Sequence, residues 1–199
     1  MSMRLLVATN NRGKLREYIA LFAGLPLQLI TLADVNLLTE VAENGTTFQE
    51  NALIKARAYC AMSGLPTLAD DSGLEVDALG GAPGLLSARY AGPNATDEDR
   101  YRKLLAALGD LPAEKRTARF RCAIALALPD GTVEITEGKC EGVIATEPHG
   151  THGFGYDPVF YLPALRCTLA EVAPEVKDRI SHRAQAAMRM KAILRRRLK

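Results

Sequence analysis

The stretch "PTLADDSGLEV", residues 66–76, places two aspartates next to each other between an apolar run and a glycine. The residues before them, 67–69, have the composition of a short buried strand. Successive side chains of a strand point to opposite faces, so Asp70 and Asp71 cannot both face one pocket if the strand persists to its end. One of the two carboxylates is therefore expected to do the chemistry.

A second candidate is the segment "VATNNRGKLRE", where a strand, a tight polar loop and a helix start follow one another. Free backbone amides and the positive end of the helix dipole favour an anion such as phosphate there, and Lys14 adds a full charge. The segment is not a P-loop, because G-x-x-x-x-G-K-[ST] is absent. The alternative is that Asn11 only caps the helix and Lys14 is solvated.

The glycine-rich loop "HGTHGFGYDP", residues 149–158, contains G-F-G. It lacks the third glycine and the following helix of a dinucleotide fingerprint. We expect a flexible loop that presents Phe154, Tyr156 and Asp157, and flat rings beside hydrogen-bonding groups suit a nucleobase. The alternative is an aromatic side chain packed in a surface loop.

Further charged residues are candidates for binding a substrate or a metal ion. Lys177 precedes His182 and Arg183 near a predicted helix start, where adjacent cations suit an anion or a carbonyl oxygen, although a lone histidine on a helix is more often structural. No His/Cys set has zinc spacing, so an all-oxygen site indicates magnesium or manganese. The acidic candidates are Glu40, Glu43, Glu50, Asp70, Asp71 and Asp157.

The elements that must position these residues follow from the apolar pattern. Strands are predicted at residues 4–8, 27–32, 67–69, 118–128, after the turn 129–131, and at 159–162. A first helix is predicted after the loop 9–14, with Leu15, Ile19 and Phe22 on its buried face. Three more helices are predicted to begin at a capping box formed by Thr47 and Glu50, at Thr96 and at Ser181. This predicts an α/β fold with a mixed central sheet flanked by helices, in one domain over residues 1–199 whose halves share the sheet around a cleft.

Composition excludes several classes of protein. The 199 residues are 48% hydrophobic and 24% charged with a net charge of +2, which is ordinary for a soluble protein and too small to indicate a polyanion partner. Four scattered cysteines without a C-x-x-C pair suit a reducing cytosol, and no signal peptide or membrane segment is apparent. The basic C-terminal residues are interpreted as cations in the last turns of a helix rather than a nucleic-acid tail.

Together these motifs resemble a known family. "ATNNRGK", "GTTFQENALIKA", "ADDSGLEVDALGGAPGLLSARYAG", "GTHGFGYDPVF" and "SHRAQA" occur in that order over nearly the whole chain. They resemble the non-standard purine nucleoside triphosphate pyrophosphatases, the Ham1 or inosine triphosphate pyrophosphatase family. The resemblance implies a magnesium-dependent homodimer with two lobes around an active-site cleft; the cysteine usage indicates a cytoplasmic protein, and the oxygen ligands allow manganese as a substitute. It also implies hydrolysis of ITP, dITP and XTP to the monophosphate and pyrophosphate, which cleanses the nucleotide pool.

The resemblance also assigns roles. It implies that Asp71 is the general base and a metal ligand, that Ser72 contacts substrate, and that Phe154 stacks on the purine. The substrate-binding positions it implies are Thr9, Asn10, Asn11, Arg12, Gly13, Lys14, Ser72, Phe154, Gly155, Tyr156, Asp157, Lys177, His182 and Arg183. Two positions depart from the family pattern: Asn10 replaces a glycine, and Ala42-Glu43 replaces adjacent glutamates, which leaves Glu43 as the second metal ligand.

In this interpretation Asp71 orients a water in line with the α-phosphate, while Asp70 points away or supports the loop. Donors aimed at the purine 6-oxo group would disfavour ATP. Two alternatives stay open: a pyrophosphatase for other nucleotides such as modified pyrimidines, and a nucleic-acid-binding module that uses the basic tail. The sequence does not rank ITP, dITP and XTP or fix the number of metal ions.

Overall fold

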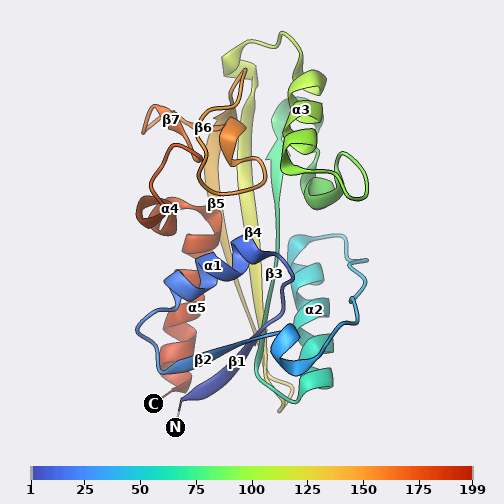
Figure 1. Cartoon of the computed structure of the whole chain (residues 1–199), viewed down its shortest axis with the longest axis vertical. Coiled ribbons are helices and arrows are strands. Elements are labelled where there is room, and N and C mark those ends of the chain that lie inside the picture. Colours follow the sequence, from blue (N-terminus) through green and yellow to red (C-terminus); the bar gives the residue numbers. More distant parts are fainter. Residues whose placement is uncertain (1, 199) are drawn as a thin grey trace. The chain divides into compact units, whose positions relative to one another are not determined.

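The computed structural model describes residues 2–198, and its strands form one open mixed sheet (Figure 1). The order across the sheet is β2-β1-β3-β4-β5-β6-β7. β1 runs parallel to β2 and β3, whereas β6 runs antiparallel to β5 and β7. The strands are β1 (Met3–Val7), β2 (Leu27–Thr31), β3 (Thr67–Val76), β4 (Thr117–Ala127), β5 (Val133–Ile144), β6 (Phe160–Leu162) and β7 (Cys167–Thr168).

Helices flank this sheet, as predicted. They are α1 (Arg12–Leu21), α2 (Phe48–Ser63), α3 (Asp97–Leu108), α4 (Pro174–Ile180) and α5 (His182–Arg197). Local signals set their ends: the side chains of Asn11, Thr47 and Thr96 accept the first orphan amides of α1, α2 and α3. Gly64 ends α2 in the left-handed conformation. Among residues 2–198, no helix has the length and apolar character needed to cross a membrane.

The chain folds into two compact units. The first contains Met1–Asp71, Cys122–Gly138 and His182–Lys199, and the second contains Ser72–Arg121 and Lys139–Ser181. β3, β4 and β5 each begin in one unit and end in the other. Each unit has its own apolar core.

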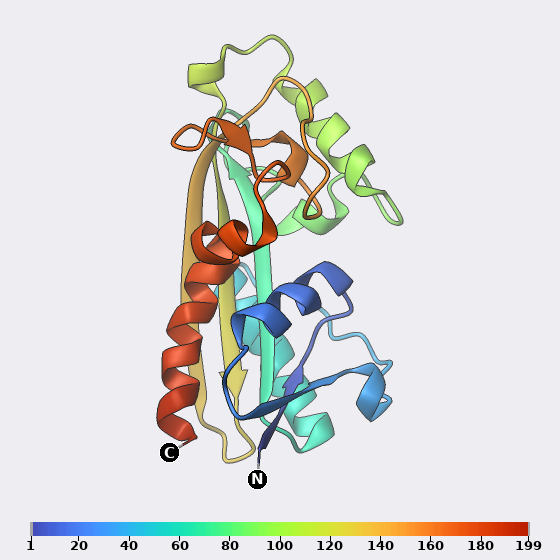
Figure 2. The same cartoon turned by 60° about the vertical axis from the view of Figure 1, so that its left-hand side comes forward.

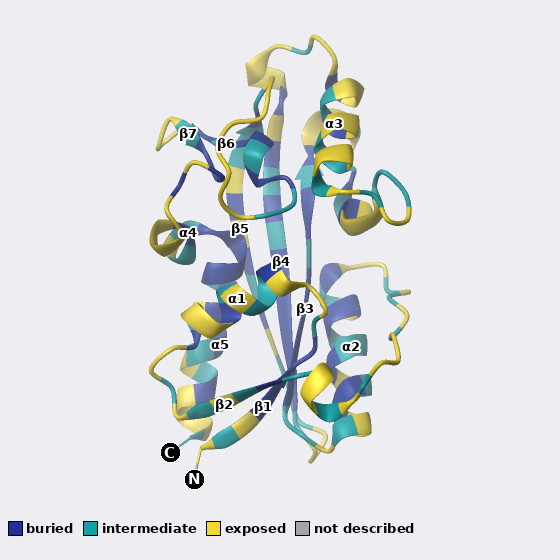
Figure 3. Cartoon of the chain, in the orientation of Figure 1, coloured by how far each residue is buried: buried dark blue, intermediate teal, exposed yellow. Residues whose placement is uncertain are grey.

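In the first unit, α1 and α5 cover one face of the sheet and α2 covers the other (Figures 1 and 2). Tyr18 and Phe22 of α1 and Met190 of α5 pack on Leu68 and Ile124. Most of β3 and β4 is buried (Figure 3). Strand alternation therefore sends neighbouring side chains of β3 to different helices.

The core of the second unit joins its strands to α3. Leu104 and Leu108 of α3 pack against Phe120, Phe160 and other side chains of that cluster. Loops from residues 77 to 96 and 145 to 159 complete the unit and include short 3₁₀ helices.

Three details differ from the sequence predictions. Ile19 is 55% exposed, and Tyr18 takes the buried position on α1 instead. β3 continues beyond the predicted residues 67–69 to Val76, so Asp70 and Asp71 both lie within the strand. Oγ1 of Thr47 accepts the amide of Glu50 as the capping box predicts, but the Glu50 carboxylate accepts the amide and hydroxyl of Thr46.

Gly138 of β5 lies where the backbone of α5 comes close to the sheet. A Cβ at this position would lie 2.2 Å from the carbonyl oxygen of His182 and 2.6 Å from the amide nitrogen of Ala186. Backbone atoms cannot move aside as a flexible side chain can, so Gly138→Ala should destabilise the protein by about 1–3 kcal/mol or more. Urea unfolding measures this, with the exposed neighbour Lys139→Ala as the control; equal midpoints for both variants would contradict the prediction.

Candidate active site

The two aspartates of β3 lie on opposite faces of the sheet, as strand alternation requires. Asp70 contacts Lys14 of α1 and Arg183 of α5. Asp71 contacts Asn51 of α2. The two carboxylates therefore lie in different environments although they are adjacent in sequence.

Asp70 belongs to a buried network of charges. Its Oδ2 atom lies 2.9 Å from Nζ of Lys14 and 3.3 Å from Nη2 of Arg183, and its side chain is 1% exposed. Burial alone would raise the pKa of Asp70, but the charges of Lys14, Arg183 and Lys55 outweigh it and hold that pKa well below its usual range. Asp70 is therefore a fixed anion that is unsuited to proton transfer near neutral pH.

The predicted phosphate loop leads from β1 into α1. Asn11 is the N-cap: its Oδ1 accepts the amide of Lys14 at 3.0 Å, and Oγ1 of Thr9 accepts the amide of Asn11 at 3.1 Å. Asn10 is not among the described residues with positive φ, so its replacement of a glycine strains no backbone. Arg12 is exposed and Gly13 is buried at the first turn of the helix. This stretch has the amides and the cation that bind an anion.

Asp71 is buried against α2 beside a second ion pair. Nδ2 of Asn51 donates to its Oδ2 at 3.0 Å, and Nζ of Lys55 lies 2.5 Å from Oε1 of Glu43. Burial raises the pKa of Asp71, and the nearby charge of Glu43 raises it further, against the opposing effects of Lys55 and Asn51. A carboxylate with a raised pKa is a better proton acceptor than an ordinary aspartate.

Lys55 and Asn51 belong to this site and were not among the residues predicted from the sequence. They are four residues apart, so they share one face of α2. That face otherwise carries Ala52 and Ala56, which are fully buried. Two polar residues at helical spacing beside small apolar residues were the available signal. Lys55 also donates to the backbone carbonyl of Asp70 at 2.7 Å, which ties α2 to the carboxylate strand.

The donor set suits a hard divalent cation only in part. Asp71 and Glu43 provide carboxylate oxygens that interact electrostatically with each other. Within residues 2–198, no three acidic, histidine or cysteine side chains gather closely enough to hold a metal ion. Magnesium is usually held by one or two carboxylates together with substrate phosphates, so a two-carboxylate site is compatible with it.

In the second unit, Asp157 organises the predicted base-binding loop. Its Oδ2 accepts the amide of Phe154 at 2.9 Å and pairs with the ammonium of Lys177 on α4. The same ammonium lies 4.9 Å from the centroid of the Phe154 ring, a cation–π contact. A side chain at Gly153 would collide with Asp157, so this turn requires glycine.

The loop differs from the expectation that it presents three side chains. Asp157 and Tyr156 are buried, and the Tyr156 hydroxyl donates to the carbonyl of Ser87. Phe154 is the half-buried ring of the loop. The amide of Gly155 donates to Oδ2 of Asp97 on α3 at 2.7 Å, a contact across 58 positions that no spacing in the sequence indicates.

The remaining predicted residues lie at element ends or within strands. Ser72 follows Asp71 on β3 and is partly buried, and His182 is buried at the first position of α5. Arg183, the next residue, is directed into the network of Asp70 rather than toward solvent.

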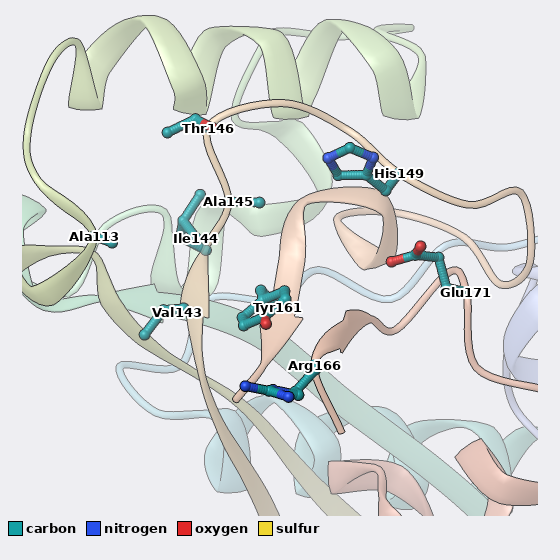
Figure 4. Close-up of a pocket in the computed structure, with 9 residues that line it drawn as sticks. All are labelled: Ala113, Val143, Ile144, Ala145, Thr146, His149, Tyr161, Arg166 and Glu171. Atoms are coloured by element: carbon teal, nitrogen blue, oxygen red, sulfur yellow. The ribbon is translucent and has the colours of Figure 1, made fainter. Parts of the chain in front are cut away.

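A pocket of about 380 Å³ lies in the second unit, and none of the predicted site residues lines it (Figure 4). Figure 4 shows Arg166 beside Tyr161, while His149 and Glu171 line another part of the pocket. The lining residues are Ala113, Val143, Ile144, Ala145, Thr146, His149, Tyr161, Arg166 and Glu171. This pocket is therefore separate from the residues with the chemistry described above.

A phosphate-type loop, a buried carboxylate with a raised pKa and a glycine-bounded aromatic loop are thus present in one chain. The sequence model of the Ham1 family matches residues 5–193. The chain belongs to the Ham1 family. This confirms the resemblance inferred from the sequence motifs.

Relatives from this family match almost end to end. A dITP/XTP pyrophosphatase of Geobacter sulfurreducens is 52% identical over 188 residues, which is 94% of each chain. The Ham1 protein structure from Coxiella burnetii has a TM-score of 0.88 at 43% identity and covers 98% of this chain and 99% of that one. The Staphylococcus aureus Ham1 protein gives 0.87 at 40% identity, with 98% and 99% covered. The mixed open sheet is thus the fold of these Ham1 neighbours.

The depressed pKa of Asp70 makes a prediction for this Ham1-family chain. Asp70 is ionised in the folded state at pH values where an unfolded aspartate, with a pKa of about 3.9, takes up a proton. Its contribution to stability is therefore present above about pH 4 and is lost as the pH falls further. Asp70→Asn should be less stable than the wild type by on the order of 3 kcal/mol at pH 7.

The difference should shrink when urea unfolding is repeated at pH values below 4. Glu98→Gln, which breaks a surface ion pair with Arg102, is the control and should change stability by less than about 1 kcal/mol at either pH. An Asp70→Asn deficit that stays constant down to pH 3 would show that the charge of Asp70 is not its source.

Proposed function

We propose that this chain hydrolyses dITP, XTP and ITP to the nucleoside monophosphate and pyrophosphate, with Asp71 as the general base for attack of water at the α-phosphate. The observation that carries the proposal is that the pKa values of the two adjacent carboxylates are shifted in opposite directions. Asp70 is held ionised by cations, whereas burial raises the pKa of Asp71. The name dITP/XTP pyrophosphatase, carried by close relatives of this chain, supports the substrate class.

The triphosphate end of the substrate is assigned to the first turn of α1. The amides there and the helix dipole favour negative charge, and Lys14 contributes an ammonium that is 16% exposed. Lys55 adds a second cation beside Asp71. Burial disfavours its charge, but Asp70, Glu43 and Asp71 outweigh burial and raise the pKa of Lys55, so it stays protonated. Lys55 therefore adds a positive charge to that of Lys14, although its ammonium is already bound to Glu43 and to the carbonyl of Asp70.

Charge balance supports a divalent cation, magnesium or manganese. Four carboxylates, Asp70, Asp71, Glu43 and Glu17, are joined to three cations, Lys14, Lys55 and Arg183. An excess of negative charge repels a triphosphate. Asp71 and Glu43 are the residues that would hold the cation. When bound, the cation offsets phosphate charge and assists ionisation of water.

Proton transfer is assigned to Asp71. The amide of Asn51 restrains its carboxylate, since Nδ2 donates to Oδ2. A carboxylate held in one orientation positions a water at the cost of little further ordering. Asp71 would accept the proton of that water as its oxygen approaches the α-phosphorus, and pyrophosphate would leave.

Purine recognition is assigned to the loop of the second unit that carries Phe154. The ring of Phe154, held by the ammonium of Lys177, offers a surface for stacking. Lys177 of the same unit carries N–H groups suited to the 6-oxo oxygen of hypoxanthine or xanthine. An adenine amino group would leave such a donor unpaired, which is costly in a buried site.

A panel of nucleoside triphosphates tests the proposal. ITP, dITP, XTP, ATP, GTP and modified pyrimidine triphosphates are incubated with and without magnesium, and pyrophosphate and orthophosphate are quantified separately. We expect pyrophosphate from the 6-oxo purine substrates in a metal-dependent reaction. Attack at the γ-phosphorus would instead release orthophosphate and leave a nucleoside diphosphate, which would contradict the proposal. Preferential turnover of modified pyrimidine triphosphates would contradict it as well.

Asp71→Asn should lower kcat by about 10²–10⁴-fold, because an amide keeps the shape but cannot accept the proton. In the wild type, kcat should fall as the pH drops through a pKa above that of an ordinary aspartate. Asp70→Asn is the matched comparison: it should reduce kcat less, and its main effect should be on substrate affinity. Melting curves establish that both variants are folded. If Asp70→Asn has the lower kcat, the catalytic face has been assigned to the wrong aspartate.

A further inference from the structure

The first turn of α3 holds the loop that carries Phe154. Oδ2 of Asp97 accepts the amide of Gly155 at 2.7 Å, and its Oδ1 pairs with the guanidinium of Arg100 one turn further along the helix. Nη2 of Arg100 in turn donates to the carbonyl of Ala95 at 2.7 Å, just before the helix begins. All of these residues belong to the second unit. The carboxylate of Asp97 is thus held by its own helix while it binds the loop.

Asp97 is not the residue that caps α3. Thr96 is the N-cap: its Oγ1 accepts the amide of Asp99 at 3.1 Å, and the carboxylate of Asp99 accepts the amide of Thr96 at 2.8 Å. This reciprocal pair is a complete capping box. Asp97 adds negative charge to the first turn, as Glu98 and Asp99 also do. The start of the helix therefore does not depend on the contact between Asp97 and the loop.

Two consecutive amides of the loop donate to two different carboxylates. The amide of Phe154 donates to Oδ2 of Asp157 at 2.9 Å, within the loop, and the amide of Gly155 donates to α3. Gly155 has a φ of +67°, a left-handed conformation that glycine adopts at little cost. The next residue, Tyr156, is anchored as well, because its hydroxyl donates to the carbonyl of Ser87 at 2.9 Å.

These two amides belong to the two peptide groups that flank the Cα atom of Phe154. Peptide groups are planar, so holding the plane on each side fixes φ and ψ of the residue between them, and with them the direction in which its ring leaves the backbone. The carbonyl of the second plane also accepts the amide of Asp157, but at 3.3 Å. The bond to Asp97 is shorter and is assisted by charge, so it is the stronger restraint on that plane.

We propose that Asp97 is a positioning residue for purine binding: through the amide of Gly155 it sets the direction of the Phe154 ring, and it does not itself contact the nucleotide. The inference rests on the proposed function, which gives that ring the purine base as its ligand. A ring that is fixed in advance loses little conformational freedom when a base stacks on it. Loss of Asp97 should therefore weaken binding of the base and leave the chemistry at the α-phosphate unchanged.

Inosine monophosphate and inorganic triphosphate are the two probes, because the first has a purine base and the second has none. Asp97→Ala should weaken binding of inosine monophosphate, measured by calorimetry with magnesium present, by about fivefold or more, and should change binding of triphosphate by less than about twofold. KM for ITP should rise while kcat changes by less than about twofold. Asp97→Asn keeps an acceptor oxygen without the charge, so its affinity should lie between those of the wild type and Asp97→Ala.

Glu98→Gln is the matched control in the same turn of α3. It removes one negative charge from the start of the helix and an exposed ion pair with Arg102. It should leave both binding constants and KM unchanged. Melting curves establish that the variants are folded, and Asp97→Asn carries the test if Asp97→Ala does not fold.

A double-mutant cycle tests whether the effect passes through the ring. Phe154→Ala removes the stacking surface and should itself weaken binding of inosine monophosphate. If Asp97 acts by directing that ring, Asp97→Ala should change the remaining affinity by less than about twofold when Phe154 is already alanine.

Three results would overturn the inference. The first is unaltered binding of inosine monophosphate in Asp97→Ala. The second is equal weakening of both probes, because the effect would then not be confined to the base. The third is full additivity of the Asp97 and Phe154 changes. Failure of the proposed function gives a different result: the wild type would release no pyrophosphate from ITP, whatever the affinities of the Asp97 variants.

Discussion

The alternation of side chains between the two faces of β3 is the constraint on which the rest of the site depends. Adjacent residues must point to opposite faces of the sheet, and in the first unit those faces are covered by different helices. Asp70 meets the cations of α1 and α5, while Asp71 meets an amide of α2 beside an ion pair. One step along the backbone therefore gives two carboxylates whose pKa values move in opposite directions. The same residue type thus gives one carboxylate with a lowered pKa and one with a raised pKa.

Much of the fold could be predicted because it depends on local signals. The caps Asn11, Thr47 and Thr96, the closing Gly64 and the apolar alternation of β4 are all properties of a few neighbouring residues. The parts that were wrong depend on distant partners. Ile19 and Tyr18 are both plausible inward residues of α1, and only the position of α5 and the sheet decides that Tyr18 is buried.

The candidate site shows the same division. The motifs of Asp71, Lys14 and Phe154 were recognisable in the sequence, whereas the groups that tune them were not. Asn51 and Lys55 look like ordinary polar residues of a helix until β3 is placed against α2. Asp97 holds Gly155 across a long separation in sequence. Residues with chemistry of their own can be recognised in a motif, whereas the helical spacing of Asn51 and Lys55 gains a meaning only once their partners on β3 are known.

The buried network of Asp70, Arg183 and Glu17 is hard to explain by stability alone. Desolvating two ion pairs costs several kcal/mol, and well-packed apolar residues of similar size are often at least as stabilising. An apolar replacement, however, would leave Lys14 on a flexible four-carbon stem with no fixed direction. A phosphate site works best when its charges are already in place, because little reorganisation is then needed as the reaction proceeds. The network fixes the ammonium of Lys14 at 2.9 Å from Oδ2 of Asp70, at the first turn of α1, and so gives that side chain a defined direction.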